Sequence, residues 1–353
     1  MLVYLINIIL IFLWAILLLK TNPTDKKKKL YCGIVALQWI LISGLRHWSV
    51  GADTYAYHDR FELVKTYSWD YIFSSCWDYL FNGATVKDPG YDLFEKIFQI
   101  FSNDYQMFLI FIAVIFTGLM ARWIYKYSSM PEISFLIYSI LFYSFYAITG
   151  QRQTVATALI VFLGYEFAQK RKFIKFAIIA FLAFLIHKSS IVFIIYYLIA
   201  NINFSYIYIT IMTVATCIIA ILGRRLYGPI GLMLGFSEDA IEYDGGGAET
   251  YATVLLMLCL TSFFLYSWIK KRREDSTYLY NMMFLTTASS LLIYQHQGFM
   301  RIQQYFSLVI MLMVPEIILT IEKKYRVWAY LGVVGVLILY LLRNNPNYRF
   351  CFM

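Results

Sequence analysis

The sequence is poor in charged residues. Charged side chains make up 14% of its 353 residues, whereas hydrophobic residues make up 61% and aromatic residues 19%. A soluble domain carries roughly a quarter charged residues. The composition therefore excludes a soluble enzyme and a disordered protein.

Cysteine and the short motifs of nucleotide and metal chemistry are also scarce. The five cysteines show neither metal-ligand spacing nor the pattern of a disulfide framework, which excludes a disulfide-stapled secreted module. The chain contains no P-loop, no glycine-rich dinucleotide fingerprint, no nucleophile elbow and no Asp-x-Asp pair. We therefore expect no metal, no cofactor and no nucleotide-driven chemistry.

Long apolar runs recur from Leu5 to Tyr340. Because such runs are long enough to cross a bilayer, we expect an all-α integral membrane protein with about 12 transmembrane helices. The first run, Val3–Leu19, lacks a basic n-region and a small-residue cleavage site, so it is expected to be a retained span. One polytopic domain over residues 1–353 follows.

The basic residues give the topology. The net charge of +9 is expected to orient the chain in the membrane rather than to bind a polyanion, so no nucleic-acid partner is expected. Basic clusters alternate with the apolar runs, and the positive-inside rule places the clusters in the cytoplasm and both termini outside. The clusters are Lys26–Lys29, Arg122 with Lys126, Lys170–Lys175, Lys270–Arg273 and Lys323–Arg326.

This topology leaves two longer extracytoplasmic loops. The first covers residues 46–104 and is rich in Tyr, Trp and Asp, which suits helices lying in the membrane interface. The second covers residues 223–250 and contains Arg224-Arg225 and the run Gly245-Gly246-Gly247.

The apolar stretch Phe173–Ala200 allows two interpretations. A single long helix would put His187 at mid-membrane and invert the topology that follows. We favour a helical hairpin with its apex at His187, Lys188 and Ser189. A helix from Lys175 to His187 climbs only about 18 Å of a roughly 30 Å hydrocarbon core. The apex would then lie below the outer surface, where irregular backbone is tolerated only beside a cavity, and this points to a recessed site.

Polar residues gather on the outer face in this topology. Charged groups beside a span are costly and mark a functional cavity, although an arginine at a helix end also serves as a snorkelling anchor. Converging guanidinium groups would clamp a phosphorylated group, because the planar fork matches phosphate oxygens bidentately. At the outer leaflet we expect a lipid-linked diphosphate. The polar residues that this topology places on the outer face are His47, His58, His187, His296, Arg46, Arg152, Lys188, Arg224, Arg225 and Arg301.

Two residues are candidates for proton transfer. Asp53, in the segment Arg46–Tyr55, is a general base, a group that orients a cation, or a cap of the following helix. His187 is a general base or acceptor-binding group, or a polar group satisfied at the hairpin apex. Glu166 and Glu316 fall in the cytoplasmic halves of spans, where we expect structural pairing, with a proton pathway as the alternative.

Four motifs occur in order along most of the chain. They are Arg46-x4-Gly51-x-Asp53-Thr54-x2-Tyr57, Gly150-Gln151-Arg152-Gln153-Thr154-Val155-Ala156, Phe184-Leu185-Ile186-His187-Lys188-Ser189-Ser190 and Arg301-x3-Tyr305-Phe306. In this order and spacing, the set resembles the EpsG family of Wzy-type polysaccharide polymerases.

The resemblance implies a multi-pass glycosyltransferase of the hexosyltransferase type, with GT-C-like architecture, in the bacterial plasma (inner) membrane. Its active site would face the periplasm or the outside. Such proteins transfer a growing glycan from undecaprenyl diphosphate to the non-reducing end of a lipid-linked repeat unit. The implied partners are the undecaprenyl-diphosphate-linked oligosaccharide, as donor and acceptor, membrane lipids and, as a candidate, a chain-length regulator protein.

The resemblance also implies residue roles. Asp53 or His187 would activate the acceptor hydroxyl, and Arg152 would complete the catalytic set. Guanidinium groups that stabilise the departing diphosphate need no metal, and a single displacement would invert the anomeric carbon. The implied diphosphate contacts are Arg46, Arg152, Arg301, Arg224, Arg225 and Lys188, and the implied sugar or acceptor contacts are His47, Tyr55, Gln151, His296 and Tyr305.

Other classes stay open at this point. An O-antigen ligase shares the donor and is separated by its products. A lipid-linked oligosaccharide flippase would line a path open to both faces, whereas the polar residues here cluster on one. A membrane-bound acyltransferase would need a buried His with an Asn or Asp partner, which His187 alone does not supply. A non-catalytic scaffold leaves the one-sided Arg and His set without a role.

Overall fold

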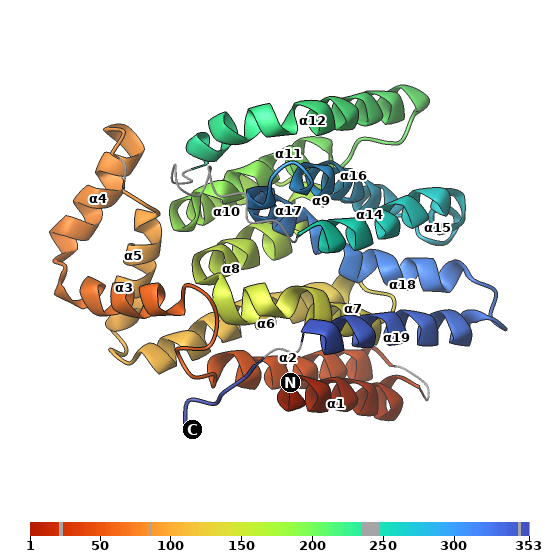
Figure 1. The fold of residues 1–353 in the computed structure, drawn as a ribbon, viewed down its shortest axis with the longest axis horizontal. Helices are drawn as coiled ribbons and strands as arrows, with labels where there is room; N and C mark the ends of the chain where they lie inside the picture. Colours follow the sequence, from red (N-terminus) through yellow and green to blue (C-terminus); the bar gives the residue numbers. More distant parts are fainter. Residues whose placement is uncertain (21–23, 85, 235–247, 345–346, 353) are drawn as a thin grey trace.

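The structure, a computed structural model, describes residues 1–20, 24–84, 86–234, 248–344 and 347–352. Within these ranges every regular element is helical, and one isolated bridge joins Arg46 to Phe350. The predicted all-helical class is therefore confirmed. Most helices run side by side as a bundle, and α3, α4 and α5 stand as an arm at one end of it (Figure 1).

The helices of the bundle divide into an N-terminal and a C-terminal set. The first set is α1 (Leu2–Leu19), α2 (Asp25–Gly44), α6 (Tyr105–Tyr127), α7 (Pro131–Ile137), α8 (Gln151–Thr157), α9 (Gly164–Gln169), α10 (Phe173–Ile186) and α11 (Ile194–Ile199). The second set is α12 (Tyr206–Met233), α14 (Glu249–Phe264), α15 (Tyr266–Arg272), α16 (Ser276–Ile293), α17 (Met300–Ser307), α18 (Ile310–Thr320) and α19 (Arg326–Asn344). The arm consists of α3 (Thr54–Thr66), α4 (Trp69–Phe81) and α5 (Pro89–Gln99).

Five short segments depart from α-helical geometry. The π-helical segments are η1 (Tyr138–Phe142), η2 (Ser144–Thr149) and η3 (Ala158–Leu163), and the 3₁₀ segments are η4 (Lys188–Phe193) and η5 (Gln297–Phe299). The Gly150 N–H donates to the Phe145 carbonyl at 2.9 Å, which closes the last π-turn before α8 begins at Gln151. Because π-turns occur frequently at functional sites, the start of α8 is a candidate position for functional residues.

Span-length helices are present in smaller number than the sequence predicts. Among the described residues, 4 helices are long and apolar enough to cross a membrane, or up to 6 if each of two bent pairs is one span. The bent pairs are α14 with α15 and α17 with α18, at 68° and 62°. Three shorter apolar helices accompany them. The helices are compatible with an integral membrane protein, and the count of about twelve stays a prediction.

The predicted hairpin at His187 is confirmed. α10 ends at Ile186, and His187 has extended backbone angles of φ −155° and ψ 109°. The ring of Tyr197, in α11, packs at 4.5 Å from that of Phe176 near the start of α10, and the Arg171 guanidinium donates to the Tyr197 carbonyl at 3.1 Å. The beginning of α10 therefore meets the end of α11, as an antiparallel pair requires.

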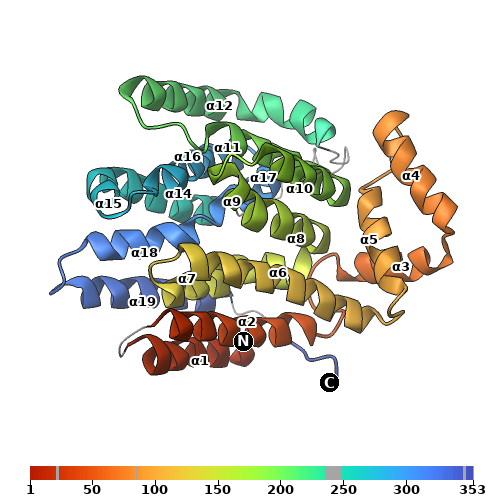
Figure 2. The same cartoon turned by 180° about the vertical axis from the view of Figure 1, so that it is seen from behind.

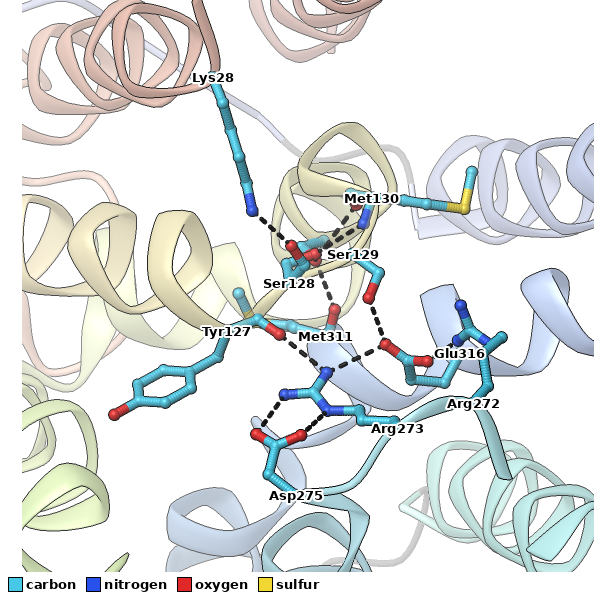
Figure 3. A network of polar contacts seen from close by, with 11 residues as sticks. Lys28, Tyr127, Ser128, Ser129, Met130, Arg272, Arg273, Asp275, Met311 and Glu316 are labelled. Atoms are coloured by element: carbon cyan, nitrogen blue, oxygen red, sulfur yellow. Dashed lines mark hydrogen bonds and ion pairs between the residues drawn. The ribbon is translucent and has the colours of Figure 1, made fainter. Parts of the chain in front are cut away.

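Basic clusters predicted to be cytoplasmic meet at the end of the bundle opposite the arm, here called the basic end. α15 and the α18–α19 connection both lie there (Figures 1 and 2). Glu316 is at the centre of a polar network at this end (Figure 3). Its carboxylate accepts from Ser129 at 2.5 Å and from Arg273 at 3.0 Å, and it pairs with Arg272. Lys28 joins the network by donating to the Ser128 carbonyl at 2.8 Å.

Glu166, the second buried carboxylate expected to pair, behaves in the same way. It forms ion pairs with Lys170 at 2.6 Å, Lys126 at 2.7 Å and Arg122 at 2.9 Å. The structural pairing predicted for both glutamates is confirmed. Glu166 joins basic residues of two connections that are distant in sequence, whereas the basic partners of Glu316, Arg272 and Arg273, are adjacent.

The arm corresponds to the predicted first long loop. Arg60 of α3 forms a two-pronged ion pair with Asp92 of α5, in which its Nε donates at 2.8 Å. The Lys96 ammonium of α5 donates to the Val64 carbonyl of α3 at 3.3 Å. α4 presents exposed aromatic side chains, including Trp77. The pairing of α3 with α5 gives the arm a defined shape over the cavity described below.

The second predicted loop is partly helical. α12 continues through Gly223 to Met233, so the first part of residues 223–250 extends the preceding helix. The run Gly245-Gly246-Gly247 lies outside the described residues.

Candidate active site

A cavity of about 630 Å³ lies between the arm and the bundle, at what is here called the cavity end. Its walls come from the arm, from the junction of η2 with α8, from the hairpin apex and from α17. Four residues singled out from the sequence meet there: Asp53, Arg152, His187 and Arg301. The other polar or aromatic lining residues are Tyr57, Arg60, Tyr71, Lys87, Asp88, Tyr91, Asp92, Phe145, Thr149 and Gln153.

Asp88 is the hub of this cavity, and it was missed by the sequence analysis. Its Oδ2 lies 3.0 Å from His187 Nδ1 and 3.1 Å from Arg152 Nη1. Its Oδ1 accepts the Lys188 backbone N–H at 3.1 Å. The side chain is 5% exposed. Burial alone would raise the pKa of Asp88, but the hydrogen bond from His187, the charge of Arg152 and the Lys188 N–H together hold it below its ordinary value.

Local sequence places Asp88 at this point. Pro89 occupies the first turn of α5, where a missing N–H costs nothing, and Asp88 takes the preceding N-cap position with φ 52°. The carboxylate makes no capping bond, so it stays available for His187 and Arg152. A Cβ on Gly90 would lie 2.5 Å from Leu185 Cβ. Glycine at this position therefore lets α5 dock against the end of α10, next to His187.

The pair of Asp88 with His187 sets the chemistry of the imidazole. A carboxylate at 3.0 Å from Nδ1 is an acceptor, so the Nδ1 proton is donated to Asp88 and Nε2 carries the free lone pair. This is the arrangement in which a carboxylate fixes the tautomer of a general base. His187 lines the cavity and is thus suited to remove a proton from a bound hydroxyl.

Lys87, Arg152 and Arg301 line the cavity together with the Asp88–His187 pair. Burial together with the charges of Arg152 and Arg301 lowers the pKa of Lys87, and Asp88 and Asp53 only partly offset this. The Arg152 guanidinium lies over the Tyr57 ring at 5.6 Å, and its Nε has no hydrogen-bond partner among the described residues. Crowded cations with an unused donor favour a multiply charged anion, and a diphosphate has the oxygens to accept from all three.

The first turn of α8 is attached to α17. The Gln153 amide donates to the Arg301 carbonyl at 2.7 Å. This bond links the segment that carries Arg152 to the one that carries Arg301. Arg152 and Arg301 are 149 residues apart in the sequence, and this bond places them on one wall of the cavity.

Asp53 lies at the N-cap position of α3 but does not act as a cap. Its φ is 60° and its side chain makes no capping hydrogen bond. Gly51, with φ 117°, forms the turn that precedes it. Asp53 lines the cavity, so the cap role has no support in its contacts, and the roles of general base and cation-orienting group stay predictions.

Arg46 is not in the cavity. The side chain is buried and donates to the Ser43 carbonyl at 2.5 Å and to the Ile148 carbonyl at 3.1 Å. These contacts hold the end of α2 against η2. The structure therefore assigns Arg46 to packing beside the site, and the predicted diphosphate contact has no support in its position.

Two predicted sugar contacts near Arg46 also lie outside the cavity lining. His47 Nδ1 is 2.7 Å from Ser49 Oγ, and its ring stacks on Trp48 at 5.5 Å. Tyr55 is exposed on α3 and meets the edge of Trp48 at 4.9 Å. Both form a surface cluster with Trp48.

Gln151 and Tyr305 are buried behind the lining rather than in it. Gln151 accepts from Tyr91 at 3.1 Å and donates to Tyr105 at 2.7 Å. The Tyr305 hydroxyl lies 3.0 Å from Ser189 Oγ, next to the hairpin apex. Each supports an element that carries a lining residue: Gln151 precedes Arg152, and Ser189 follows His187.

The remaining predicted residues have varied positions. His296 is buried, stacks on Tyr227 at 3.6 Å and accepts the Gly298 N–H at 3.0 Å. Lys188 contributes its backbone N–H to Asp88. Arg225 is exposed on α12, and the side chain of Arg224 lies outside what the structure describes.

The sequence offered only a weak signal for Lys87 and Asp88. An acidic residue directly before Pro89 is typical of a helix start, and that interpretation is locally correct. The contact that brings Asp88 into the candidate site joins it to His187, 99 residues later, and no local pattern encodes such a pairing. Among the described residues, no group of three or more His, Cys, Asp or Glu side chains is placed to hold a metal ion.

The chain was compared with protein-family models, with curated proteins and with solved structures. The model of the EpsG family matches residues 29–352, a range that contains every residue lining the cavity. A search of the curated proteins and a search of the solved structures each found no match.

Proposed function

Because the chain belongs to the EpsG family of Wzy-type polysaccharide polymerases, we propose that it transfers a growing glycan from undecaprenyl diphosphate to the non-reducing end of a lipid-linked repeat unit. The observation that carries this proposal is the meeting of the Asp88–His187 pair with Lys87, Arg152 and Arg301 in one cavity. A general base beside a cluster of cations matches a reaction that deprotonates a hydroxyl and releases a diphosphate.

The proposed step is a single displacement. The acceptor hydroxyl loses its proton to His187 Nε2, and its oxygen bonds to the anomeric carbon of the donor. The bond from that carbon to the diphosphate oxygen breaks, and the departing diphosphate keeps the electron pair. Arg152, Arg301 and Lys87 stabilise its charge, so the step needs no metal. Because it is a single displacement, the step inverts the anomeric carbon. Asp88 orients His187 and stabilises the imidazolium.

Asp53 has a separate role in this scheme. It lies on the arm side of the cavity and contributes a second carboxylate beside the cations. We assign it to acceptor binding, because the Asp88–His187 pair already supplies an oriented base. The proposal thus takes His187 as the base, where the sequence had left Asp53 and His187 as alternatives.

The membrane-bound acyltransferase is the alternative that gains most from the structure, since His187 has an Asp partner. Acyl transfer from a thioester, however, does not release a diphosphate and gives no role to Lys87, Arg152 and Arg301. We further propose that the cavity faces the periplasm or outside of a bacterial plasma membrane, because the basic end lies opposite and would be cytoplasmic.

Deletion of the gene in its host, with the wild-type copy as rescue, tests the proposal. Lipid-linked and surface glycans are profiled by electrophoresis and mass spectrometry. Loss of the polymer ladder while single repeat units accumulate on the carrier or surface is the expected result. Polymer that is made but not attached would indicate a ligase, repeat units trapped on the cytoplasmic leaflet would indicate a flippase, and an unchanged profile would refute the proposal.

A further inference from the structure

A second cavity, of about 320 Å³, adjoins the first. Phe145 and Thr149 line both cavities. α17 also serves both, because Arg301 lines the first cavity and Gln304, one turn later, lines the second. The two spaces therefore lie on either side of the same two segments.

The second cavity has a different chemistry from the first. None of the described residues that line it is charged. Its polar lining consists of hydroxyl and amide groups, among them Ser144, Tyr251, Gln297 and Gln304. We refer to it as the neutral cavity, and to the cavity around Asp88 and Arg152 as the charged cavity.

Gln304 lines the neutral cavity and carries a buried amide oxygen. Its side chain is 6% exposed, and its Oε1 has no hydrogen-bond partner among the described residues. A buried amide oxygen without a hydrogen-bond partner is unfavourable, and a ligand hydroxyl would satisfy it. An isoprenoid tail has no donor and would leave this oxygen unsatisfied.

Aromatic rings accompany these polar groups. Tyr146 donates its hydroxyl to the Gln304 carbonyl at 2.7 Å, and the Phe145 ring meets the Tyr146 ring edge-on at 5.1 Å. A Cβ on Gly150 would collide with the Phe145 ring, so this ring lies directly over the backbone where α8 begins. A sugar presents apolar C–H faces to rings and hydroxyl groups to amides, without net charge.

We infer that the neutral cavity holds an uncharged sugar residue of the lipid-linked glycan while the diphosphate occupies the charged cavity. This inference rests on the proposed function. The shared wall of Phe145 and Thr149 would place the sugar next to the reacting bond. Gln304 thereby becomes a residue that contributes to glycan specificity rather than to leaving-group stabilisation.

Binding measurements on the full chain in lipid nanodiscs test the inference with two probes. One is the oligosaccharide released by mild acid from the lipid-linked repeat units of the host, and the other is undecaprenyl diphosphate without sugar. Gln304→Leu should weaken oligosaccharide binding roughly tenfold, since a hydrogen bond inside a site is lost, while affinity for undecaprenyl diphosphate stays within about twofold. Arg152→Lys should give the reverse pattern.

Gln38→Leu is the matched control, because Gln38 also has a buried Oε1 without a partner among the described residues but lines neither cavity. Gln304→Asn keeps the amide but shortens the side chain by one methylene group, so it should weaken oligosaccharide binding to an intermediate extent. Because this change is small, it separates a loss of binding from a folding defect. Equal oligosaccharide affinity in Gln304→Leu and Gln38→Leu would overturn the inference. So would a Gln304→Leu variant that loses only undecaprenyl diphosphate, because the neutral cavity would then hold lipid. A wild-type protein that binds neither probe would instead refute the proposed function itself.

Discussion

The two ends of the bundle each bury a carboxylate among cations, yet they use it differently. At the cavity end, Asp88 contacts Arg152 and His187, and both partners line a cavity of about 630 Å³. At the basic end, Glu316 is 1% exposed and is held by Ser129, Arg272 and Arg273 (Figure 3). None of these three partners lines the cavity.

In the proposed function, burial and ion pairing alone do not distinguish a catalytic carboxylate from a structural one. Glu316 links three chain segments, and neither it nor its partners Ser129, Arg272 and Arg273 line the cavity. Asp88 instead orients a histidine whose second nitrogen is available, beside a guanidinium with an unused Nε. We therefore expect substitutions at Asp88 to affect turnover and substitutions at Glu316 to affect stability.

The largest effect is expected for Asp88→Asn. An amide removes the charge that fixes the His187 tautomer, so polymerisation should fall by roughly 10²–10⁴-fold. The initial rate of chain extension, measured on purified protein with a lipid-linked repeat unit, reports the change. Asp70→Asn, on the exposed face of α4, is the control and should keep wild-type activity. Comparable rates for the two variants would show that Asp88 is structural, like Glu316.

Arg152→Lys should have the next largest effect. Lysine keeps the charge but loses the planar fork that matches two phosphate oxygens, so kcat should drop by roughly 10²-fold. Membrane abundance is measured alongside the rate, since Arg152 also contacts Asp88. Near-normal rate and abundance would remove Arg152 from the proposed diphosphate contacts.

The sequence predicted the cavity end only in part, and the reason is physical. The composition, the hairpin apex at His187 and the pairing of Glu166 and Glu316 follow from hydropathy and from the cost of unpaired charge in a membrane. These rules act locally along the chain. These rules did not identify Asp88, because its partners Arg152 and His187 are distant in sequence. Its local pattern, Asp before Pro89, is that of an ordinary helix start.

Arg46 is a residue whose contacts the sequence did not predict. Its motif and its position at a span end were correctly recognised as unusual, yet the carbonyls of Ser43 and Ile148 bind its guanidinium. Whether a helix-end arginine meets a carbonyl or a ligand depends on the neighbouring π-helical segment η2. No periodicity in the sequence predicted that segment.

Glu316→Gln should destabilise the fold without slowing the folded enzyme. Removing one partner of a buried ion pair leaves Arg272 and Arg273 without their shared carboxylate, which costs about 3 kcal/mol. Thermal unfolding in nanodiscs measures the loss, and activity is expressed per folded molecule. Glu322→Gln, an exposed carboxylate near Lys324, should leave both quantities unchanged. A Glu316→Gln variant with wild-type stability and reduced turnover would mean that the basic end takes part in the reaction.

The smallest effect concerns a proton on Lys87. Burial and the charges of Arg152 and Arg301 hold its pKa below the usual value in the free protein. A bound diphosphate reverses this, because an adjacent anion favours the charged ammonium and raises the pKa. Between the lowered pKa and the ordinary value of about 10.4, binding should therefore take up a fraction of a proton, and affinity should fall as pH rises through this window.

Calorimetry of undecaprenyl diphosphate binding, repeated in buffers of different ionisation enthalpy, measures that uptake. Lys87→Met should abolish it, whereas Lys65→Met, which removes a lysine paired with Glu62, should not. Uptake that persists in Lys87→Met would place the titrating group elsewhere. Proton uptake that depends on Lys87 would separate the cavity end from the basic end by a measurable property. A cation that lines a ligand cavity changes its protonation when the ligand binds, whereas the cations paired with Glu316 do not.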